Sequence, residues 1–428
     1  QWCIWVGQHA RCPIASARRP PSPTSTMSSR PTKPQTPVVR RATSQRSANN
    51  AAAVVKALTQ EAFECGLDNI AASSIAKRAG LTTGAIYSRY ENSDEMLIAL
   101  WQQVVAHELR ALVAETVEAV TTRSTTGVPS DLVARLEKPS RILGLGAEFV
   151  VMAQRNEVVG EVVIAEVSKW LHEAGLQSGA TAIDRACVAL GASIAIGSAL
   201  RSFVTTTNPA IGLVLDGIHN AYLSANAKHS RAKVQVPEPI RSNTGSALRD
   251  ALIDATAEVM SKTGFTGATI SRIARKSGVT SGSIYNFYPD KEALMNDAVN
   301  ELMRTTQNQT LDAKRTASTK QQPNFGLTDS FHFGLSADRR TWLRFRQECI
   351  IATRHHKTTF KQMKKVVAEL DQAMIDSFPK IDKQIIGLVS MGEQAIGYGF
   401  SSLFGYTNLL DKCDFDAIMV QVAKQNSL

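Results

Sequence analysis

Hydrophobic residues recur along most of this chain at the three- and four-residue intervals of amphipathic helices. Residues 96–122 show the pattern clearly, with apolar side chains at Leu97, Leu100, Trp101, Val104 and Val105. Because one face of an α-helix repeats every 3.6 residues, this spacing predicts a long helix. The same pattern predicts helices over residues 131–154, 157–173, 182–203, 209–225, 296–312, 339–356, 358–378, 383–404 and 414–424.

Residues 268–295 carry a shorter pattern, which predicts two brief helices joined by a turn. Ile273 would face inward on the first helix and Ile284 on the second. Gly278 lies between them, and glycine ends a helix readily because it adopts a positive φ without a Cβ clash. The side-chain oxygen of Thr280 can cap the second helix. This arrangement is a helix-turn-helix, whose second helix enters the DNA major groove.

The outward positions of this segment carry polar and basic side chains. They are Arg272, Arg275 and Lys276 on the first helix, which Thr269 or Ser271 can cap, and Ser281, Ser283, Tyr285 and Asn286 on the second. For Arg272 we favour DNA contact over a solvated surface position, and for Arg275 and Lys276 both interpretations stay open. Asp290 can cap the following helix, and Lys291 at its start can meet a phosphate together with backbone N–H groups.

The same pattern occurs 198 residues upstream without a gap. The paired positions are Gly66 and Gly264, Ile75 and Ile273, Gly80 and Gly278, Gly84 and Gly282, Tyr87 and Tyr285, and Tyr90 and Tyr288. Weaker matches follow at offsets of 199 and 200, namely Ala153 and Arg155 with Ala352 and Arg354, Ala195 and Gly197 with Ala395 and Gly397, and Thr207 and Asn208 with Thr407 and Asn408. A nearly constant offset predicts that a whole structural unit was duplicated.

The repeated segment resembles the DNA-binding domain of the TetR family of bacterial transcription regulators. The shared features are the turn glycine, the capping threonine at 82 and 280, the glycine two residues later, and the Tyr-x-x-Tyr pair. The resemblance extends over roughly 45 residues, which makes it far more specific than a short motif. It implies an all-α fold with two TetR-like units. Each would consist of an N-terminal helix-turn-helix domain and a helical ligand-binding and dimerisation domain.

We expect six segments from this resemblance and from composition. They are a disordered basic tail (1–46), a first helix-turn-helix domain (47–101), a first helical domain (102–228), a linker (229–245), a second helix-turn-helix domain (246–299) and a second helical domain (300–428). The residues expected to contact DNA are Thr82, Thr83, Gly84, Tyr87 and Tyr90 in the first copy, and Arg272, Thr280, Ser281, Gly282, Ser283, Tyr285, Asn286, Tyr288 and Lys291 in the second.

Within the second copy we assign different contacts to different side chains. Lys291 and Tyr288 should position the protein on phosphates, while Ser281, Ser283 and Asn286 face base edges. An asparagine there can pair bidentately with adenine. Of each tyrosine pair, one member should be packed and the other should offer its hydroxyl to a phosphate.

The first copy departs from this pattern in ways that weaken its expected grip on DNA. Ser74, Ala85, Ser88 and Ser93 stand where the second copy has Arg272, Ser283, Asn286 and Lys291. Ala71 also replaces Thr269, so the helix cap must come from Asn69 or Ser73. We therefore expect the first copy to fold but to bind DNA less tightly and less specifically.

Small residues are dense in the predicted helix 182–203, and glycines recur at Gly387, Gly392, Gly397 and Gly399 in the matching region. Glycine costs a helix roughly 1 kcal/mol against alanine, so such clusters predict close approach of another helix. TetR-like proteins dimerise through their last two helices, and this chain holds two such pairs. We therefore expect an internal pseudo-dimer, with a homodimer as the alternative. The apolar stretch 187–200 is expected to be a buried helix, not a membrane span.

Composition adds limits to this interpretation. The formal net charge of +10 fits a nucleic-acid partner, and residues 1–50 contain basic but no acidic side chains. For that segment we favour a solvated tail over an arm that follows DNA. Six cysteines without C-x-x-C spacing favour a reducing compartment and argue against a metal cluster. Phosphate-binding loops, nucleophile elbows and clustered carboxylates do not occur in the sequence, so we expect no enzymatic activity, cofactor or metal.

The sequence thus predicts a bacterial, cytoplasmic and nucleoid-associated DNA-binding regulator. We expect a repressor that binds an asymmetric double-stranded operator through two non-identical heads. A small apolar or amphipathic effector of unknown identity would release it, and no membrane is involved. The alternative is a protein–protein interaction module that kept the fold but lost DNA binding in one or both copies.

Overall fold

The computed structural model describes residues 38–123, 127–205, 207–226, 238–320 and 327–425. The predicted disorder of residues 1–37 and most of the predicted linker lie outside these ranges. Residues 38–46, also predicted to be disordered, are instead the start of a helix that begins at Val38. Throughout the described residues the secondary structure is helical, without strands, as the sequence predicts.

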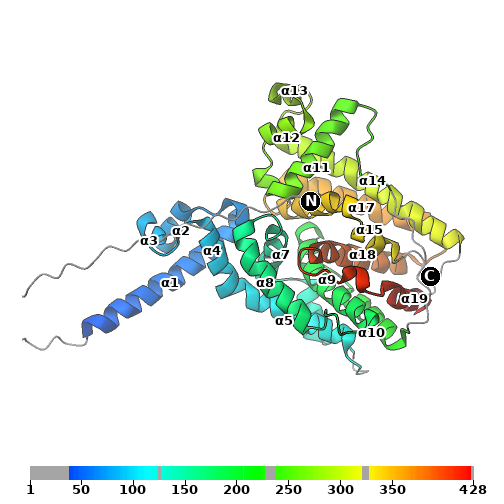
Figure 1. Ribbon diagram of the computed structural model, residues 1–428, viewed down its shortest axis with the longest axis horizontal. Helices are drawn as coiled ribbons and strands as arrows, with labels where there is room; N and C mark the ends of the chain where they lie inside the picture. Colours follow the sequence, from blue (N-terminus) through cyan, green and yellow to red (C-terminus); the bar gives the residue numbers. More distant parts are fainter. Residues whose placement is uncertain (1–37, 124–126, 206, 227–237, 321–326, 426–428) are drawn as a thin grey trace, which may run out of the picture. The chain divides into compact units, whose positions relative to one another are not determined.

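The described residues of the first half form a succession of helical elements (Figure 1). They are α1 (Val38–Cys65), η1 (Leu67–Asn69), α2 (Ala72–Ala79), α3 (Thr83–Tyr87), α4 (Ser93–Leu100), η2 (Trp101–Val105), α5 (Ala106–Thr121), α6 (Ser130–Glu137), α7 (Arg141–Met152), α8 (Glu157–Glu173), α9 (Ala182–Thr205) and α10 (Ile211–Ser224).

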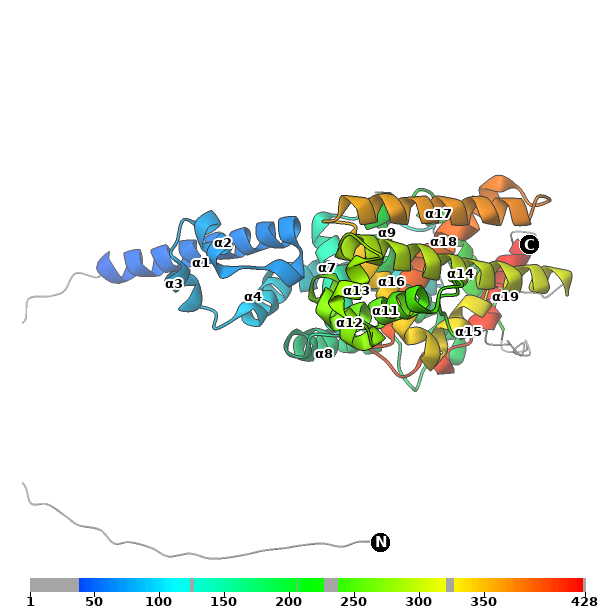
Figure 2. The same ribbon diagram turned by 90° about the horizontal axis from the view of Figure 1, so that it is seen from above.

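The second half is described by a similar order of elements. They are α11 (Ala247–Gly267), α12 (Ile270–Ser277), α13 (Ser281–Tyr285), α14 (Lys291–Thr319), α15 (Asp329–Leu335), η3 (Ala337–Arg339), α16 (Arg340–Ala352), α17 (Lys357–Ser377), α18 (Lys383–Leu403), η4 (Leu410–Lys412) and α19 (Phe415–Gln425). α14 packs along α17, and the two helices lie side by side in both views (Figures 1 and 2).

Two helix boundaries differ from the sequence prediction. The single helix expected over 131–154 is broken into α6 and α7, because Pro139 cannot continue a helix and Ser140 starts a new one. The Ser140 hydroxyl accepts the Leu143 N–H at 3.2 Å. The long helix expected over 96–122 does form, but as α4 and α5 joined by the wider π-turn η2 at Trp101.

Corresponding elements keep the predicted offset of 198 through the helix-turn-helix segments. Gly66 and Gly264 both have positive φ, 81° and 71°, as do Gly80 and Gly278, at 67° and 75°. Buried positions correspond in the same way, as Val54 with Leu252, Ile75 with Ile273, Ile86 with Ile284, Tyr90 with Tyr288 and Met96 with Leu294. The same positions therefore supply core side chains in both segments.

Further along the chain the offset shifts to 200, which corrects one of the sequence matches. α7 is capped by Ala153 and α16 by Thr353, and the next helices begin at Glu157 and Lys357. Arg155 therefore takes the place of His355 in the turn and not that of Arg354, with which the sequence pairs it.

α9 and α18 pack against each other with backbone close to backbone. A Cβ added to Gly197 would overlap the Ala395 carbonyl oxygen, and one added to Gly399 would overlap the Ser193 carbonyl oxygen. This explains the predicted clusters of small residues. α9 is long and apolar enough to cross a membrane, yet 89% of its most apolar stretch is buried. α10 and α19 pack on each other and against this crossing.

Candidate nucleic-acid interface

The second helix-turn-helix is shaped by three side-chain caps. Thr269 Oγ1 accepts the Arg272 N–H at 3.3 Å, Thr280 Oγ1 accepts the Ser283 N–H at 3.1 Å, and Asp290 Oδ1 accepts the Ala293 N–H at 2.8 Å. Each cap satisfies a backbone donor that an isolated helix start would leave unpaired. All three confirm sequence predictions, with Thr269 and not Ser271 as the first cap. We call α11–α13 with the start of α14 the second head.

A small core holds α13 in place beneath its outer face. Ile273, Ile284 and Leu294 are fully buried there. Tyr288 is only 8% exposed, and its hydroxyl donates to Asp297 Oδ2 at 2.6 Å. Arg249 donates to both oxygens of the same carboxylate, at 2.8 and 2.6 Å. Burial alone would raise the pKa of Asp297, but these hydrogen bonds hold it below its usual range. The Tyr288 hydroxyl is thus engaged inside the head. Its predicted phosphate contact stays a prediction.

The outer face of α13 carries the exposed groups. Tyr285 is 56% exposed and Phe287 is 50% exposed, and Asn286 and Gly282 are exposed beside them. Ser281 and Ser283 are half-buried, and the Ser283 hydroxyl lies 2.9 Å from Thr280 Oγ1. Tyr285 is thus the exposed member of its tyrosine pair. Phe287 was not predicted, since its position next to a buried tyrosine left its orientation ambiguous in the sequence.

The basic side chains of the second head differ in whether they are already bound within the protein. Arg275 is exposed, while Arg272 Nη1 donates to the Gly267 carbonyl at 2.7 Å. Lys276 is paired with Glu258 at 2.7 Å. Lys291 Nζ donates to the Phe265 carbonyl at 2.9 Å, and burial lowers the pKa of this half-buried amine. Lys291 therefore helps to fix α14 against α11, which the sequence did not predict, and two of its three donors are left for a phosphate.

The first helix-turn-helix, α1–α4 with η1, has the same local design with fewer polar contacts. We call it the first head. Thr82 Oγ1 accepts the Ala85 N–H at 3.2 Å, and Thr83 and Gly84 are exposed. Tyr87 is 54% exposed while Tyr90 is 7% exposed, so Tyr90 is mainly packed and Tyr87 is the exposed member of its pair. The DNA contact predicted for both stays a prediction.

One predicted cap is absent from the first head. The N-cap of α2 is Ala71, and no side chain caps it. Asn69, one of the two expected substitutes, instead donates to the Cys65 carbonyl at 2.9 Å and to Thr266 Oγ1 at 3.3 Å. The other, Ser73, lies inside the helix. Arg78, which occupies the place of Lys276, is bound by Glu61 at 2.8 Å and also by Glu64. The first head therefore presents less free positive charge on α2.

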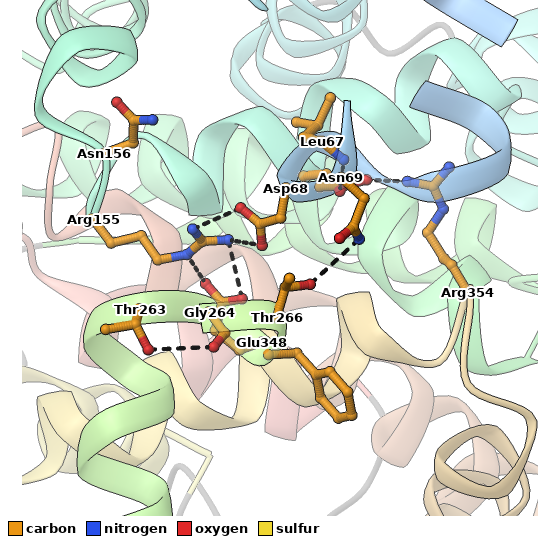
Figure 3. A network of polar contacts seen from close by, with 12 residues as sticks. Leu67, Asp68, Asn69, Arg155, Asn156, Thr263, Gly264, Thr266, Glu348 and Arg354 are labelled. Atoms are coloured by element: carbon orange, nitrogen blue, oxygen red, sulfur yellow. Dashed lines mark hydrogen bonds and ion pairs between the residues drawn. The ribbon is translucent and has the colours of Figure 1, made fainter. Parts of the chain in front are cut away.

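The first head is tied to the helical core by a set of ion pairs, most of whose side chains are buried (Figure 3). Arg155 donates to Asp68 of η1 at 3.0 and 2.8 Å and to Glu348 of α16 at 2.6 Å. Arg354 pairs in turn with Glu148 of α7. Glu148 also accepts the Leu67 N–H at 2.9 Å. We call these five side chains the Arg155 network.

The glycines at the ends of the heads make room for this network. A Cβ added to Gly264 would lie 2.6 Å from Arg155 Cζ, and one added to Gly66 would lie 3.0 Å from His355 Nε2. Each head thus rests against the turn that follows α7 or α16 in the other half of the chain. Burial raises the pKa of Glu348 to about 7 and also raises that of Glu148, despite the arginines beside them. The sequence flagged Arg155 and Arg354 as a repeat match but gave no sign of their acidic partners.

A cavity of about 170 Å³ lies in the helical part of the second half, between α14, α16, α17 and α18. Most of its wall is apolar, and the sequence predicted a ligand site only as a consequence of the family resemblance. Among the described residues, no three His, Cys, Asp or Glu side chains are grouped to hold a metal ion.

Comparison with known proteins finds relatives for part of this chain. Residues 252–298, within the second head, match the family described as bacterial regulatory proteins, tetR family. The chain is 34% identical over 67 residues to the HTH-type transcriptional regulator BetI of Stenotrophomonas maltophilia (strain R551-3), covering 16% of this chain and 31% of that protein. It is 26% identical over 124 residues to BetI of Paraburkholderia phytofirmans (strain DSM 17436 / LMG 22146 / PsJN), covering 28% and 60%.

The chain thus spans less than two thirds of the length of either relative. Together these matches support the TetR family and a DNA-binding transcriptional regulator.

Proposed function

We propose that this protein is a ligand-released repressor in which two TetR-like units, joined in one chain, form an internal pseudo-dimer. The observation that carries the proposal is the capped α13 of the second head, which exposes Tyr285 and Asn286 within the segment that matches the family. A short helix fixed at both ends, with polar side chains outward, fits the major groove of DNA. The six-segment division given above is part of this proposal, except that residues 38–46 belong to α1.

The pairing of α9 and α10 with α18 and α19 supports the pseudo-dimer. These four helices pack together within one chain, which is the role that the last two helices of each subunit have in TetR-like dimers. Residues 49–428 also form one compact unit. The reciprocal ion pairs of Arg155 with Glu348 and of Arg354 with Glu148 link the same halves a second time.

The two heads differ at the positions that would contact DNA, so we propose an asymmetric operator. Asn286 is exposed and can pair bidentately with adenine, whereas Ser88 in the same place donates its hydroxyl to the Ala85 carbonyl at 3.0 Å. Ser93 replaces Lys291. One half-site would be well defined, and the other degenerate and held mainly through phosphates.

Release by a ligand would act through α16. This helix lines the cavity with Trp342 and Arg346, carries Glu348 of the Arg155 network, and packs against α11 of the second head. A ligand that favours one position of α16 shifts both heads at once, since Arg155 also holds Asp68 of the first head. The protein would release DNA because the spacing of the two heads changes, while the charge of the heads stays the same.

In-vitro selection from a random DNA pool tests the asymmetric operator directly. We expect winners with one conserved half-site, and Asn286→Ala should relax sequence choice at one position there, worth roughly 1–3 kcal/mol. Ser88→Ala, the matched change in the first head, should have a much smaller effect.

Salt titration distinguishes regulator from interaction module. Affinity for the selected DNA should fall steeply with salt concentration, and Arg275→Ala should reduce the slope by about one. A strict palindrome among the winners would contradict the asymmetric operator and the pseudo-dimer. Salt-independent or absent DNA binding would favour a protein–protein interaction module instead.

A further inference from the structure

The cavity in the second half combines an apolar wall with unusual polar groups. Aromatic and sulfur-containing side chains supply much of the wall, including Phe331, Trp342, Met374, Phe400 and Met419. Its volume of about 170 Å³ is close to the roughly 150 Å³ of a buried apolar cavity that accommodates benzene. The size therefore fits a ligand whose apolar body is about one six-membered ring.

Three side-chain nitrogens of residues that line this cavity have no acceptor among the described residues. Arg339, Trp342 and Arg346 follow one another at intervals of three and four residues, which places them on one side of η3 and α16. Their Nε, Nε1 and Nε atoms are buried and have no hydrogen-bond partner. Buried donors are almost always paired in proteins, so three orphans around one cavity indicate a missing acceptor.

The two arginines also lack a carboxylate. Arg346 Nη2 donates to the Gly397 carbonyl at 2.8 Å and to Ser401 Oγ at 2.9 Å, both neutral acceptors. Arg339 Nη2 donates to the Glu238 carbonyl and to Gln309. Neither forms an ion pair with any described residue.

The acidic side chain in the cavity wall is already neutralised. Glu393 accepts from Lys314 Nζ at 2.6 Å, and that lysine is only 1% exposed. Burial, together with the like charge of Arg346, lowers the pKa of Arg339 to about 10, and burial also lowers that of Arg346. An uncompensated buried charge is costly. The cavity therefore holds an excess of positive charge that an anion would relieve.

We propose that this cavity binds a small monoanion with an apolar body of about one ring, its anionic group held by Arg339, Arg346 and Trp342 Nε1. Hydrogen bonds between ionised partners are the stronger ones, and arginine suits the planar geometry of a carboxylate. The proposal rests on the proposed function, in that such a molecule would be the effector, and it adds the chemical class of that effector.

The three donors of this site are absent from the corresponding positions of the first half. At the offset of 200, Pro139, Ile142 and Gly146 stand where Arg339, Trp342 and Arg346 lie, so all three donors are replaced. A Cβ on Gly146 would already meet Leu109 and Val105 at 3.3 Å. We therefore expect one anion per chain, bound in the second half.

Isothermal titration of the full chain with three probes of similar shape tests the proposal. Phenylacetate carries the anion, phenylacetamide is its uncharged counterpart, and phenethylammonium carries the opposite charge. We expect phenylacetate to bind at least about tenfold more tightly than either of the others, with one molecule per chain, because only the carboxylate can pair with both arginines.

Variants locate the bound anion. Arg346→Gln and Arg339→Gln should each remove most of the preference for phenylacetate over phenylacetamide, while the amide still binds. Arg344→Gln, the same change on the same helix but outside the cavity wall, should keep the full preference. If Arg346→Gln does not fold, Arg339→Gln still decides the question.

Each other outcome counts against the proposal. Equal affinity for acid and amide, stronger binding of phenethylammonium, or no heat from any probe at several millimolar would overturn it, as would two bound anions per chain. These titrations contain no DNA, so they stand apart from the test of the regulator. If the chain binds the anion but not DNA, the ligand class holds and the proposed function fails.

Discussion

At the scale of single residues, the tyrosine pair of the second head contrasts one packed with one exposed side chain. Tyr285 and Tyr288 are three residues apart, yet one is 56% exposed and the other 8%. The Tyr288 hydroxyl belongs to a buried cluster with Asp297 and Arg249. The two hydroxyls should therefore respond to removal in different assays.

We expect Tyr288→Phe to lower the free energy of unfolding by about 1–3 kcal/mol, because it leaves the buried Asp297 short of one donor. Tyr285→Phe should leave stability within about 0.5 kcal/mol and weaken DNA binding instead. Urea denaturation and DNA titration of both variants provide the comparison. The assignment fails if Tyr288→Phe weakens DNA binding without loss of stability.

His355 gives the molecule an acid-sensitive contact at the first head. Its Nε2 atom is buried without a partner and faces Gly66. Burial, with the neighbouring charge of Arg354, lowers the pKa of His355 from 6.5 to about 4. The folded protein therefore resists a proton that the unfolded chain accepts between these pH values, and stability falls as the pH drops from 6.5 to 4.

His355→Phe should remove this part of the pH dependence, which amounts to at most about 3 kcal/mol. Free energies of unfolding at pH 7 and pH 4.5 measure it as a difference between variant and wild type. Because Glu348, with its pKa raised to about 7, shifts stability in the opposite sense, only that difference isolates the histidine.

At the scale of elements, the crossing of α9 and α18 depends on bare backbone at two glycines. We expect Gly399→Ala to destabilise the protein by about 1–3 kcal/mol, since its methyl group would push the Ser193 carbonyl away. Gly387→Ala lies on the same helix with no atom within 4 Å of the added Cβ. It should stabilise by about 0.5–1 kcal/mol through helix propensity alone. Thermal denaturation of both variants measures the contrast, and shifts of the same sign would contradict the crossing.

The Arg155 network should couple the heads to the helical core energetically. Arg155→Ala would leave Glu348 as an uncompensated buried carboxylate, so we expect a loss of about 3–5 kcal/mol. Arg110→Ala is the control, because it removes an ion pair with Glu173 of similar length, 3.0 Å, that is exposed. It should lower the free energy of unfolding by at most about 1 kcal/mol. Denaturant titration compares the two, and similar losses would mean that burial is not what makes the network matter.

At the scale of the whole molecule, α9 and α10 pack with α18 and α19 within one chain. Under the proposed function, this packing occupies the helices through which separate TetR-like chains would associate. We therefore expect the protein to have the mass of one chain, 46.4 kDa, in light scattering at low micromolar concentration. Tethering makes the internal contact effectively concentrated and favours it over association between chains. A mass of twice that value would instead favour a homodimer.

Much of this arrangement follows from local chemistry and was therefore visible in the sequence. Thr269 and Thr280 cap helices because a hydroxyl beside an open helix start finds an unpaired N–H whatever surrounds it. Gly278 ends α12 because a residue without a Cβ adopts its φ of 75° without steric strain. The small residues of α9 and α18 indicated a close approach, and their structure shows one.

What the tertiary structure decided are the pairings between distant side chains. Whether Tyr288 or Tyr285 faces inward, and whether Lys291 donates to the Phe265 carbonyl, depends on neighbours up to 26 residues away along the chain. Arg155 pairs with Glu348, which lies 193 residues away along the chain. The sequence match of Arg155 with Arg354 is one residue out of register, which only the ends of α7 and α16 reveal. Helix propensity and capping act over a few residues, so the sequence by itself determined the elements. Burial and charge pairing depend on which elements meet, and only the tertiary structure decides that.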